Sequence, residues 1–115
     1  MQKTKKHKKS ILQPKDGTCY ICSRLHGDYR IKLTEEHHIF YGSANRKVSE
    51  TEGFKVDLCR RHHNYEWGCC PEAVHHNPTG AGMDLWLKQE AQRKYEETHS
   101  REEFMKLIGK NYLTV

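Results

Sequence analysis

Alternating apolar and polar positions mark two short strands in the middle of the chain. Phe54, Val56 and Leu58 are apolar, and polar residues stand between them. Successive side chains of a strand point to opposite faces, so this pattern predicts a half-buried strand. Residues 35–41 predict an earlier strand. Residues 42–45 have turn composition, residues 46–52 suit a short helix or an extended loop, and Gly53 is placed to end such a helix in a left-handed conformation.

Helical periodicity dominates the last third of the chain. Residues 84–98 predict a helix whose apolar side packs over the strands. Ser100 and Glu103 form a capping box that opens a final helix to Ile108, which Gly109 ends. A further helix is expected to begin near His62, and residues 25–33 are expected to be irregular or extended. The fold class is therefore a small α+β domain with C-terminal helices. In the helix 84–98 the apolar positions are Leu85, Leu87, Ala91 and Tyr95, and the solvated ones are Lys88, Gln89, Gln92, Arg93 and Glu96.

Two pairs of metal-binding residues share one spacing. Cys19 and Cys22 are separated by two residues, as are Cys59 and His62. This pattern is typical of one tetrahedral structural zinc, with the first pair forming a knuckle whose backbone amides face the sulfurs. The alternative fourth ligands are Cys69 and Cys70, although their spacing from Cys59 is longer than is usual in such sites.

The charge is concentrated in the first residues. The chain has 115 residues and a net charge of +5, and without five early lysines its basic residues would equal its 15 acidic ones in number. We interpret residues 1–14 as a disordered basic tail that attracts nucleic-acid phosphates, and residues 15–115 as one domain. No apolar run approaches the roughly 18 residues of a membrane span, and the odd number of cysteines suits metal in a reducing compartment, so we expect a cytoplasmic protein without membrane contact. The five lysines are Lys3, Lys5, Lys6, Lys8 and Lys9.

Several histidines remain beside the predicted zinc ligands. His37 and His38 lie in the first predicted strand, and His63 follows His62 directly. The two adjacent strand histidines cannot both point at one metal. A catalytic zinc usually has three protein ligands, which makes His75 the first candidate for a further ligand and His76 the second, whereas magnesium or manganese would need fewer.

These residues together resemble the HNH nuclease family, and most closely its zinc-stapled members. The resemblance is carried by residues 37–42 with Asn45, Arg46 and Lys47, and by residues 58–63 with residues 74–75. It implies a ββα-metal core. It further implies that His37 and His63 bind a catalytic Mg²⁺, Mn²⁺, Zn²⁺ or Ni²⁺, that His38 is the general base, and that Arg46 and Lys47 hold the substrate backbone. In one position the chain departs from the family: Phe54 stands where an asparagine usually pins the loop between the strands, and Asn45 and Asn64 are the alternative candidates.

The resemblance implies a metal-dependent endonuclease that hydrolyses DNA phosphodiester bonds. The same pattern is similar to small phage proteins, including a recombination-associated nuclease, and this similarity implies a recombinase filament as a second partner. The alternative hypothesis is a non-catalytic zinc-knuckle module that binds nucleic acid or acts as an adaptor. That alternative accounts for the zinc ligands and the basic tail, but not for three further histidines beside them.

Overall fold

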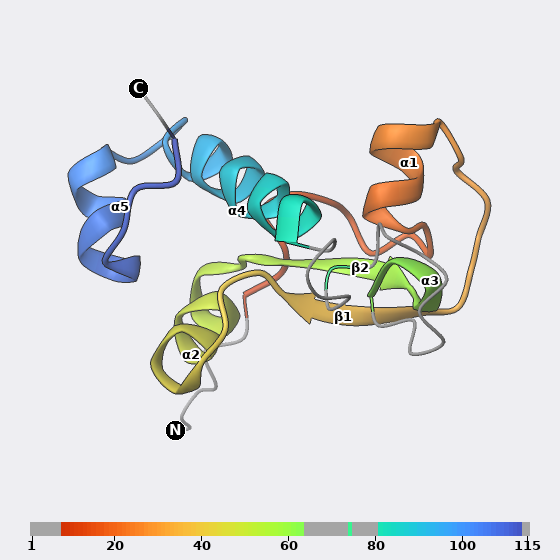
Figure 1. The fold of residues 1–115 in the computed structure, drawn as a ribbon, viewed down its shortest axis with the longest axis horizontal. Helices are drawn as coiled ribbons and strands as arrows, with labels where there is room; N and C mark the ends of the chain where they lie inside the picture. The colour runs from red at the N-terminus through yellow and green to blue at the C-terminus, as the bar shows by residue number, and fades with distance from the viewer. Residues whose placement is uncertain (1–7, 64–73, 75–80, 114–115) are drawn as a thin grey trace, which may run out of the picture.

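The computed structural model describes residues 8–63, 74 and 81–113 (Figure 1). Within these ranges the chain forms two strands and five helices. The α+β class is confirmed in this coarse form. In chain order the elements are α1 (Tyr20–His26), β1 (Thr34–His38), α2 (Ser43–Glu52), β2 (Lys55–Cys59), α3 (Arg60–His63), α4 (Ala81–Tyr95) and α5 (Arg101–Ile108).

The two strands form an antiparallel hairpin that has different helices at its two ends. Thr34 pairs with Cys59 at one end, and His38 pairs with Lys55 at the other. Helices α1 and α3 lie at the first end, and α2, which connects the strands, lies at the second (Figure 1). The hairpin therefore links a cysteine-rich end to a helical connection.

Aromatic side chains form the centre of the core. Phe40, Phe54 and Phe104 are almost fully buried, and their rings lie 5.3 to 6.0 Å apart in edge-on arrangements. Tyr95 joins the same cluster from the end of α4. Such rings bury much apolar area per residue. This packing explains how a chain with only 35% hydrophobic residues holds α4 and α5 against the hairpin.

The connection between the strands is more helical than predicted. Helix α2 begins at Ser43, three residues before the segment expected to be helix or loop, and the amide of Arg46 donates to the carbonyl of Gly42 at 2.9 Å. Strand β1 is correspondingly shorter than residues 35–41. Gly53 ends α2 with φ of 80°, as predicted, and its amide donates to the carbonyl of Ser49. Likewise, α5 has the predicted capping box and ends before Gly109.

Residues 8–13, which the sequence assigns to a disordered tail, instead contact the body. The amide of Lys8 donates to the carbonyl of Glu50, and that of Ile11 donates to the carbonyl of Gly53. Ile11 and Leu12 pack against the core. This segment covers one side of β2, which is why β2 is buried at all five positions rather than at alternate ones. Residues 1–7 lie outside the described residues.

Helix α4 differs from its predicted polar side at one residue. Gln92 is fully buried, whereas Leu85, expected on the apolar side, is 45% exposed. The Gln92 side chain donates to Asn111 Oδ1 at 2.8 Å and accepts from the amide of Tyr112 at 2.8 Å. A buried amide must satisfy its hydrogen bonds, and here the C-terminal segment supplies the partners.

None of the described helices has the length and apolar character that a membrane span requires.

The cap of α2 gives a test of this packing. A Cβ on Gly53 would meet the backbone carbonyl of Lys9, whereas one on Gly109, also at positive φ, meets no described atom within 4 Å. We expect Gly109→Ala to lower the free energy of unfolding by about 1 kcal/mol, the cost of a left-handed alanine. Gly53→Ala should lower it by about 3 kcal/mol, since a steric clash adds to that cost. Urea unfolding of both variants measures the difference, and equal losses would show that residues 8–11 do not pack on Gly53.

Candidate metal centres

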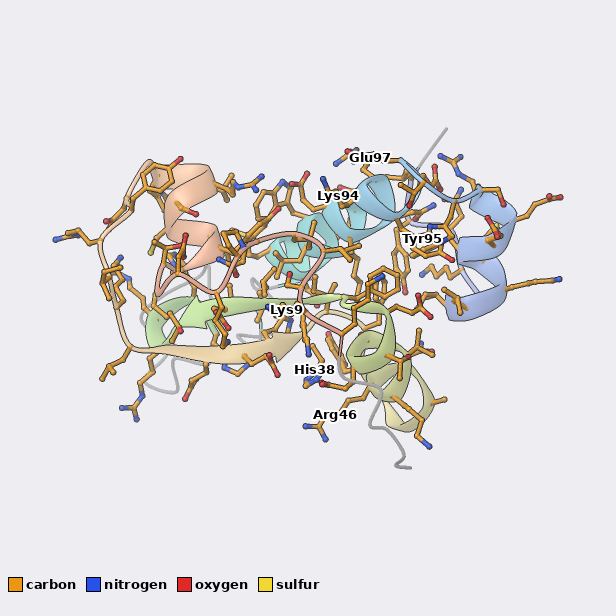
Figure 2. All side chains as sticks on the ribbon, turned by 180° about the vertical axis from the view of Figure 1, so that it is seen from behind. Lys9, His38, Arg46, Lys94, Tyr95 and Glu97 are labelled. Carbon is orange, nitrogen blue, oxygen red and sulfur yellow. The ribbon has the colours of Figure 1, made fainter. Side chains whose placement is uncertain are left out.

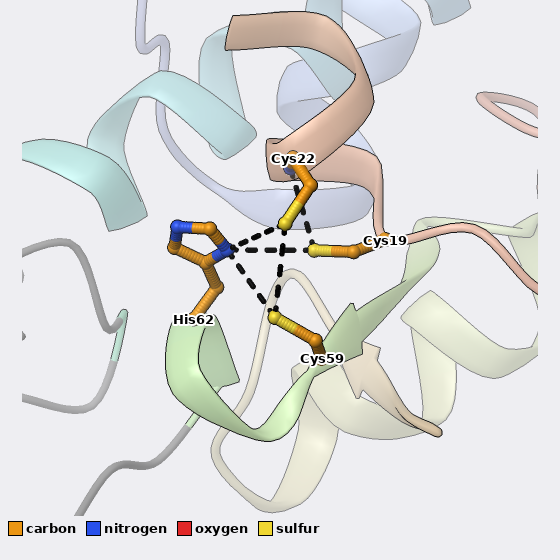
Figure 3. Close-up of side chains that lie close together, drawn as sticks. All are labelled: Cys19, Cys22, Cys59 and His62. Atoms are coloured by element: carbon orange, nitrogen blue, oxygen red, sulfur yellow. Dashed lines mark hydrogen bonds between the residues drawn. The ribbon is translucent and has the colours of Figure 1, made fainter. Parts of the chain in front are cut away.

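Three cysteines and one histidine meet in a buried cluster at the α1 and α3 end of the hairpin (Figure 3). Cys19 and Cys22 come from the start of α1, Cys59 ends β2, and His62 lies in α3. His62 Nδ1 lies 3.4 to 3.5 Å from all three sulfurs, and the sulfurs of Cys22 and Cys59 are 3.8 Å apart. The four residues predicted from spacing are thus brought together as one site.

These separations match the edges of a zinc tetrahedron. With bonds of about 2.3 Å to sulfur and about 2.0 Å to nitrogen, two sulfurs lie about 3.8 Å apart, and a sulfur and a nitrogen about 3.5 Å apart. Ordinary packing of thiols around an imidazole has no reason to give both values at once. The donor set also fits, because three cysteines and one histidine are a common structural zinc site. The cluster is therefore consistent with structural Zn²⁺.

The local backbone prepares Cys19 for this position. Cys19 is the N-cap of α1, and its sulfur accepts the amide of Cys22 at 3.4 Å, the knuckle geometry that the sequence predicts. Desolvation by burial raises the pKa of the Cys19 thiol to about 12. A metal that binds there at neutral pH must therefore displace a proton.

A lysine balances the charge of the cluster. Lys32 Nζ donates to Cys22 Sγ at 2.9 Å and to Asp28 Oδ2 at 2.7 Å. These two hydrogen bonds raise the pKa of Lys32, and the one to Asp28 contributes most. The Lys32 ammonium therefore stays charged. Three thiolates and one Zn²⁺ carry a net charge of −1, and the Lys32 ammonium offsets it.

Two of the remaining histidines meet on one side of the hairpin. The rings of His37 in β1 and His63 in α3 lie 5.2 Å apart. His37 is 2% exposed, and His63 Nδ1 lies 2.8 Å from Glu35 Oε1. A carboxylate on one ring nitrogen is the usual partner of a histidine that binds metal through the other. Glu35 was missed from the sequence because the register that brings it to His63 depends on the folded hairpin.

A third metal ligand was expected from His75, which lies outside the described residues, as do His76, Cys69, Cys70 and Asn64. The residue before His75 is described. Val74 is buried, and its amide donates to the carbonyl of His62 at 2.8 Å. The chain therefore returns to α3 one residue before His75.

His38 points to the opposite side of β1, as strand alternation requires. Its Nε2 lies 2.7 Å from Glu50 Oε1 on α2, and Lys55 Nζ lies 2.9 Å from the other oxygen of that carboxylate. Glu36 completes a group whose ligand atoms all lie within 4.8 Å of those of His38 and Glu50. Neither Glu36 nor Glu50 was predicted, since only the position of α2 brings Glu50 to His38.

Ser49 holds the connection between the strands in place, a role that the HNH resemblance implies for an asparagine. Ser49 is fully buried, and its Oγ donates to the carbonyl of Phe40 at 2.7 Å and accepts the Phe40 amide at 3.0 Å. Phe54, at the expected asparagine position, instead packs in the aromatic core. Asn45 lies partly buried in the first turn of α2. The connection between the strands is therefore fixed by Ser49, a residue without a sequence signal of its own.

The predicted phosphate-binding residues lie around α2. Arg46 and Lys47 are exposed on this helix, and His38 lies at its side (Figure 2). Lys8 and Lys9 are also exposed, and Lys9 lines a groove of about 500 Å³ together with Lys15, Lys55 and Glu36. The remaining predicted residues, Lys5 and Lys6, lie outside the described residues. Of this set, Arg46 stands one helical turn before Glu50, the residue that contacts His38, and the backbone of Lys8 is bound to Glu50.

Comparison of the chain with protein-family models, with curated proteins and with solved structures finds no match. Any likeness to a nuclease family therefore depends on the residue pattern alone. What the structure itself shows is a buried cluster of three cysteines and one histidine, joined to a two-stranded hairpin and helices.

Variants of the adjacent residues His62 and His63 test the buried cluster separately from the site beside it. We expect His62→Ala to lose the tightly held zinc and to unfold at a lower temperature, because three thiolates alone leave the tetrahedron open. His63→Ala is the matched control and should keep one chelator-resistant zinc, since its Nδ1 contacts Glu35 instead. Elemental analysis after EDTA dialysis, with thermal unfolding followed by circular dichroism, tests both. Full zinc retention in His62→Ala would contradict the assignment.

Proposed function

We propose that the chain is a zinc-stabilised, metal-dependent endonuclease that hydrolyses DNA phosphodiester bonds. The observation that carries the proposal is the approach of His37 and His63, 5.2 Å between ring centroids, beside the buried cysteine cluster. Two imidazoles from a strand and from the helix that follows its partner strand are the ligand arrangement implied by the HNH resemblance. Glu35 supports it, because a carboxylate on one ring nitrogen is the usual partner of a histidine that binds metal.

In this proposal His37 and His63 hold a divalent cation, with His75 as the predicted third ligand. When bound, the cation supplies positive charge that stabilises the developing negative charge of the scissile phosphate. The chain's own groups then have separate tasks. His37 and His63 position the cation, and Glu35 keeps the ring of His63 in one orientation.

His38 is proposed as the base that takes a proton from the attacking water. An imidazole suits this task, because it can take up a proton and release it again at physiological pH. His37 and His38 point to opposite sides of the strand. In an in-line displacement at phosphorus, the attacking water and the leaving oxygen also lie on opposite sides. A phosphate at the end of β1 would therefore have the proposed metal ligands on the side of its leaving oxygen and His38 on the side of the attacking water.

The charge around His38 supports a polyanionic substrate. Arg46, Lys47, Lys8 and Lys9 are exposed near α2, and the amide of Lys8 is bound to the carbonyl of Glu50. Lys8 therefore lies beside the residue whose carboxylate contacts His38. Contacts of this kind position a phosphate backbone without reading its sequence, so little sequence preference is expected.

Cleavage of supercoiled plasmid and of single-stranded circles tests the proposal. The purified protein is assayed with Mg²⁺, Mn²⁺, Zn²⁺ or Ni²⁺, alongside His38→Ala and His99→Ala. We expect wild-type protein to nick or linearise DNA and His38→Ala to lose at least about 100-fold in rate, the usual contribution of a general base. His99, an exposed histidine beyond α4, is the matched control and should be dispensable.

Two outcomes would contradict this proposal, the first its nuclease activity and the second the role of His38. The first is that wild-type protein cleaves neither substrate with any metal, alone or with a recombinase filament, while it still shifts DNA in a gel; this result would favour the non-catalytic binding module. The second is undiminished cleavage by His38→Ala, which would remove the base from His38. Zinc content and circular dichroism of the variant show whether a loss of rate reflects unfolding.

A further inference from the structure

The contact between His38 and Glu50 fixes which ring nitrogen carries a hydrogen. His38 Nε2 lies 2.7 Å from Glu50 Oε1, and the two side chains are only 14% and 21% exposed. An ionised carboxylate can only accept, so Nε2 must be the donor. In a neutral ring Nδ1 is then the nitrogen with the free lone pair. Among the described residues, Nδ1 has no hydrogen-bond partner.

Lys55 holds the Glu50 carboxylate in place from its other oxygen. Its Nζ lies 2.9 Å from Glu50 Oε2, and 3.8 Å from Glu36 Oε2, and its side chain is 9% exposed. Lys55 pairs with His38 across the hairpin, so strand β2 supplies the ammonium and helix α2 the carboxylate. A buried charge of this kind has to be paired, which makes a defined geometry for all three groups favourable.

The carboxylate is also held by the backbone that carries it. Ser49, the residue before Glu50, is tied to both backbone groups of Phe40, two residues after His38. Gly53 ends the helix and accepts the amide of Ile11. The distance between His38 and Glu50 is therefore set by a helix whose backbone is held by Phe40 and Ile11, and not by a loop.

The same residues could be considered as metal ligands, because Glu36, His38 and Glu50 offer donor atoms within 4.8 Å of one another. Lys55 favours a different role. Its ammonium contacts both carboxylates and so already provides the positive charge that a cation would bring. The remaining charged groups along this face are Asp57, paired with Lys15 at 2.9 Å, and Lys9 at the groove.

We propose that Glu50 is a positioning residue that holds His38 as the Nε2–H tautomer and directs Nδ1 outward as the proton acceptor. The use of Nδ1 in catalysis rests on the proposed function, whereas the tautomer does not. A carboxylate in this position also stabilises the imidazolium that forms after proton transfer. Glu50→Ala should therefore act on the turnover rate and not on DNA binding.

The tautomer is measured directly by nitrogen-15 NMR of the histidine rings in the zinc-loaded protein, with the His38 signals assigned by their absence in His38→Ala. We expect wild-type protein to show a protonated Nε2 and an unprotonated Nδ1. Glu50→Ala should give a mixture of tautomers. Glu50→Gln should favour the Nδ1–H tautomer, because its amide oxygen accepts from the Lys55 ammonium and its NH2 group then donates to His38 Nε2. Glu52→Gln, on the same helix, is the matched control and should change nothing.

Cleavage assays of the same variants supply the second readout. Glu50→Ala should lose about 10- to 100-fold in kcat with KM for DNA unchanged, as is usual for residues that orient a functional histidine, and Glu50→Gln, which favours the other tautomer, should not recover that loss. Thermal unfolding identifies a variant that merely fails to fold, in which case Glu50→Gln, of the same shape, carries the test.

Three results would overturn the inference: a wild-type Nδ1–H tautomer, an unchanged tautomer in Glu50→Ala, or Glu50→Ala that cleaves as fast as wild type. The metal alternative is tested by adding one further equivalent of Mn²⁺ or Zn²⁺. A change in the His38 signals of wild-type protein that is absent in Glu50→Ala would also overturn the inference, since the group would then be a metal site. Failure of the nuclease proposal is distinguishable, because it removes cleavage from wild-type protein and leaves the tautomer measurement intact.

Discussion

The buried cluster of Cys19, Cys22, Cys59 and His62 is the contact on which the rest of the fold depends. It joins α1 to the end of β2 and to the adjoining α3, which are separated from α1 in the sequence by β1 and α2. A two-stranded hairpin alone is marginally stable, and a chain of this size buries only a modest core. At the α2 end, aromatic packing and Ser49 stabilise the hairpin. At the other end the four side chains of the cluster, which suit a metal ion, add to the apolar packing of Tyr20, Ile21 and Leu58.

The two faces of β1 follow from the strand period and divide the candidate chemistry. His37 and Glu35 point toward α3, whereas His38 and Glu36 point toward α2. His63 and His38 each contact a carboxylate: Glu35 for His63 and Glu50 for His38. The two glutamates come from different elements, so the resemblance between the pairs is chemical and does not reflect a repeated motif. In both pairs a carboxylate contacts one ring nitrogen and so fixes the orientation of the ring.

Local rules predicted much of this arrangement from sequence, and tertiary partners explain the rest. The zinc ligands were recognisable because their spacing is short, and Gly53, Ser100 and Gly109 because caps are set by neighbouring residues. Gln92 was misjudged because its partners are about twenty residues away, in Asn111 and Tyr112. Residues 8–13 were misjudged for the same reason, since a short lysine-rich segment shows no sign of the β2 surface that it covers. The contact of Glu50 with His38 was not predicted, because it depends on a helix that begins at Ser43. Residues 42–45 have turn-forming composition and gave no sign of that helix start.

The positions of His62 and His63 tie the structural site to the candidate catalytic one. They are neighbours in a helix of four residues, and one faces the sulfurs while the other faces His37. A short helix has little stability of its own, so the orientation of His63 depends on what holds His62. Loss of the cluster would therefore displace His63 from His37 even if β1 stayed in place. His38 is different, because its orientation comes from α2 and Lys55 at the other end of the hairpin. The proposed base and the proposed metal ligands are thus positioned by opposite ends of the hairpin, which the paired strands β1 and β2 connect.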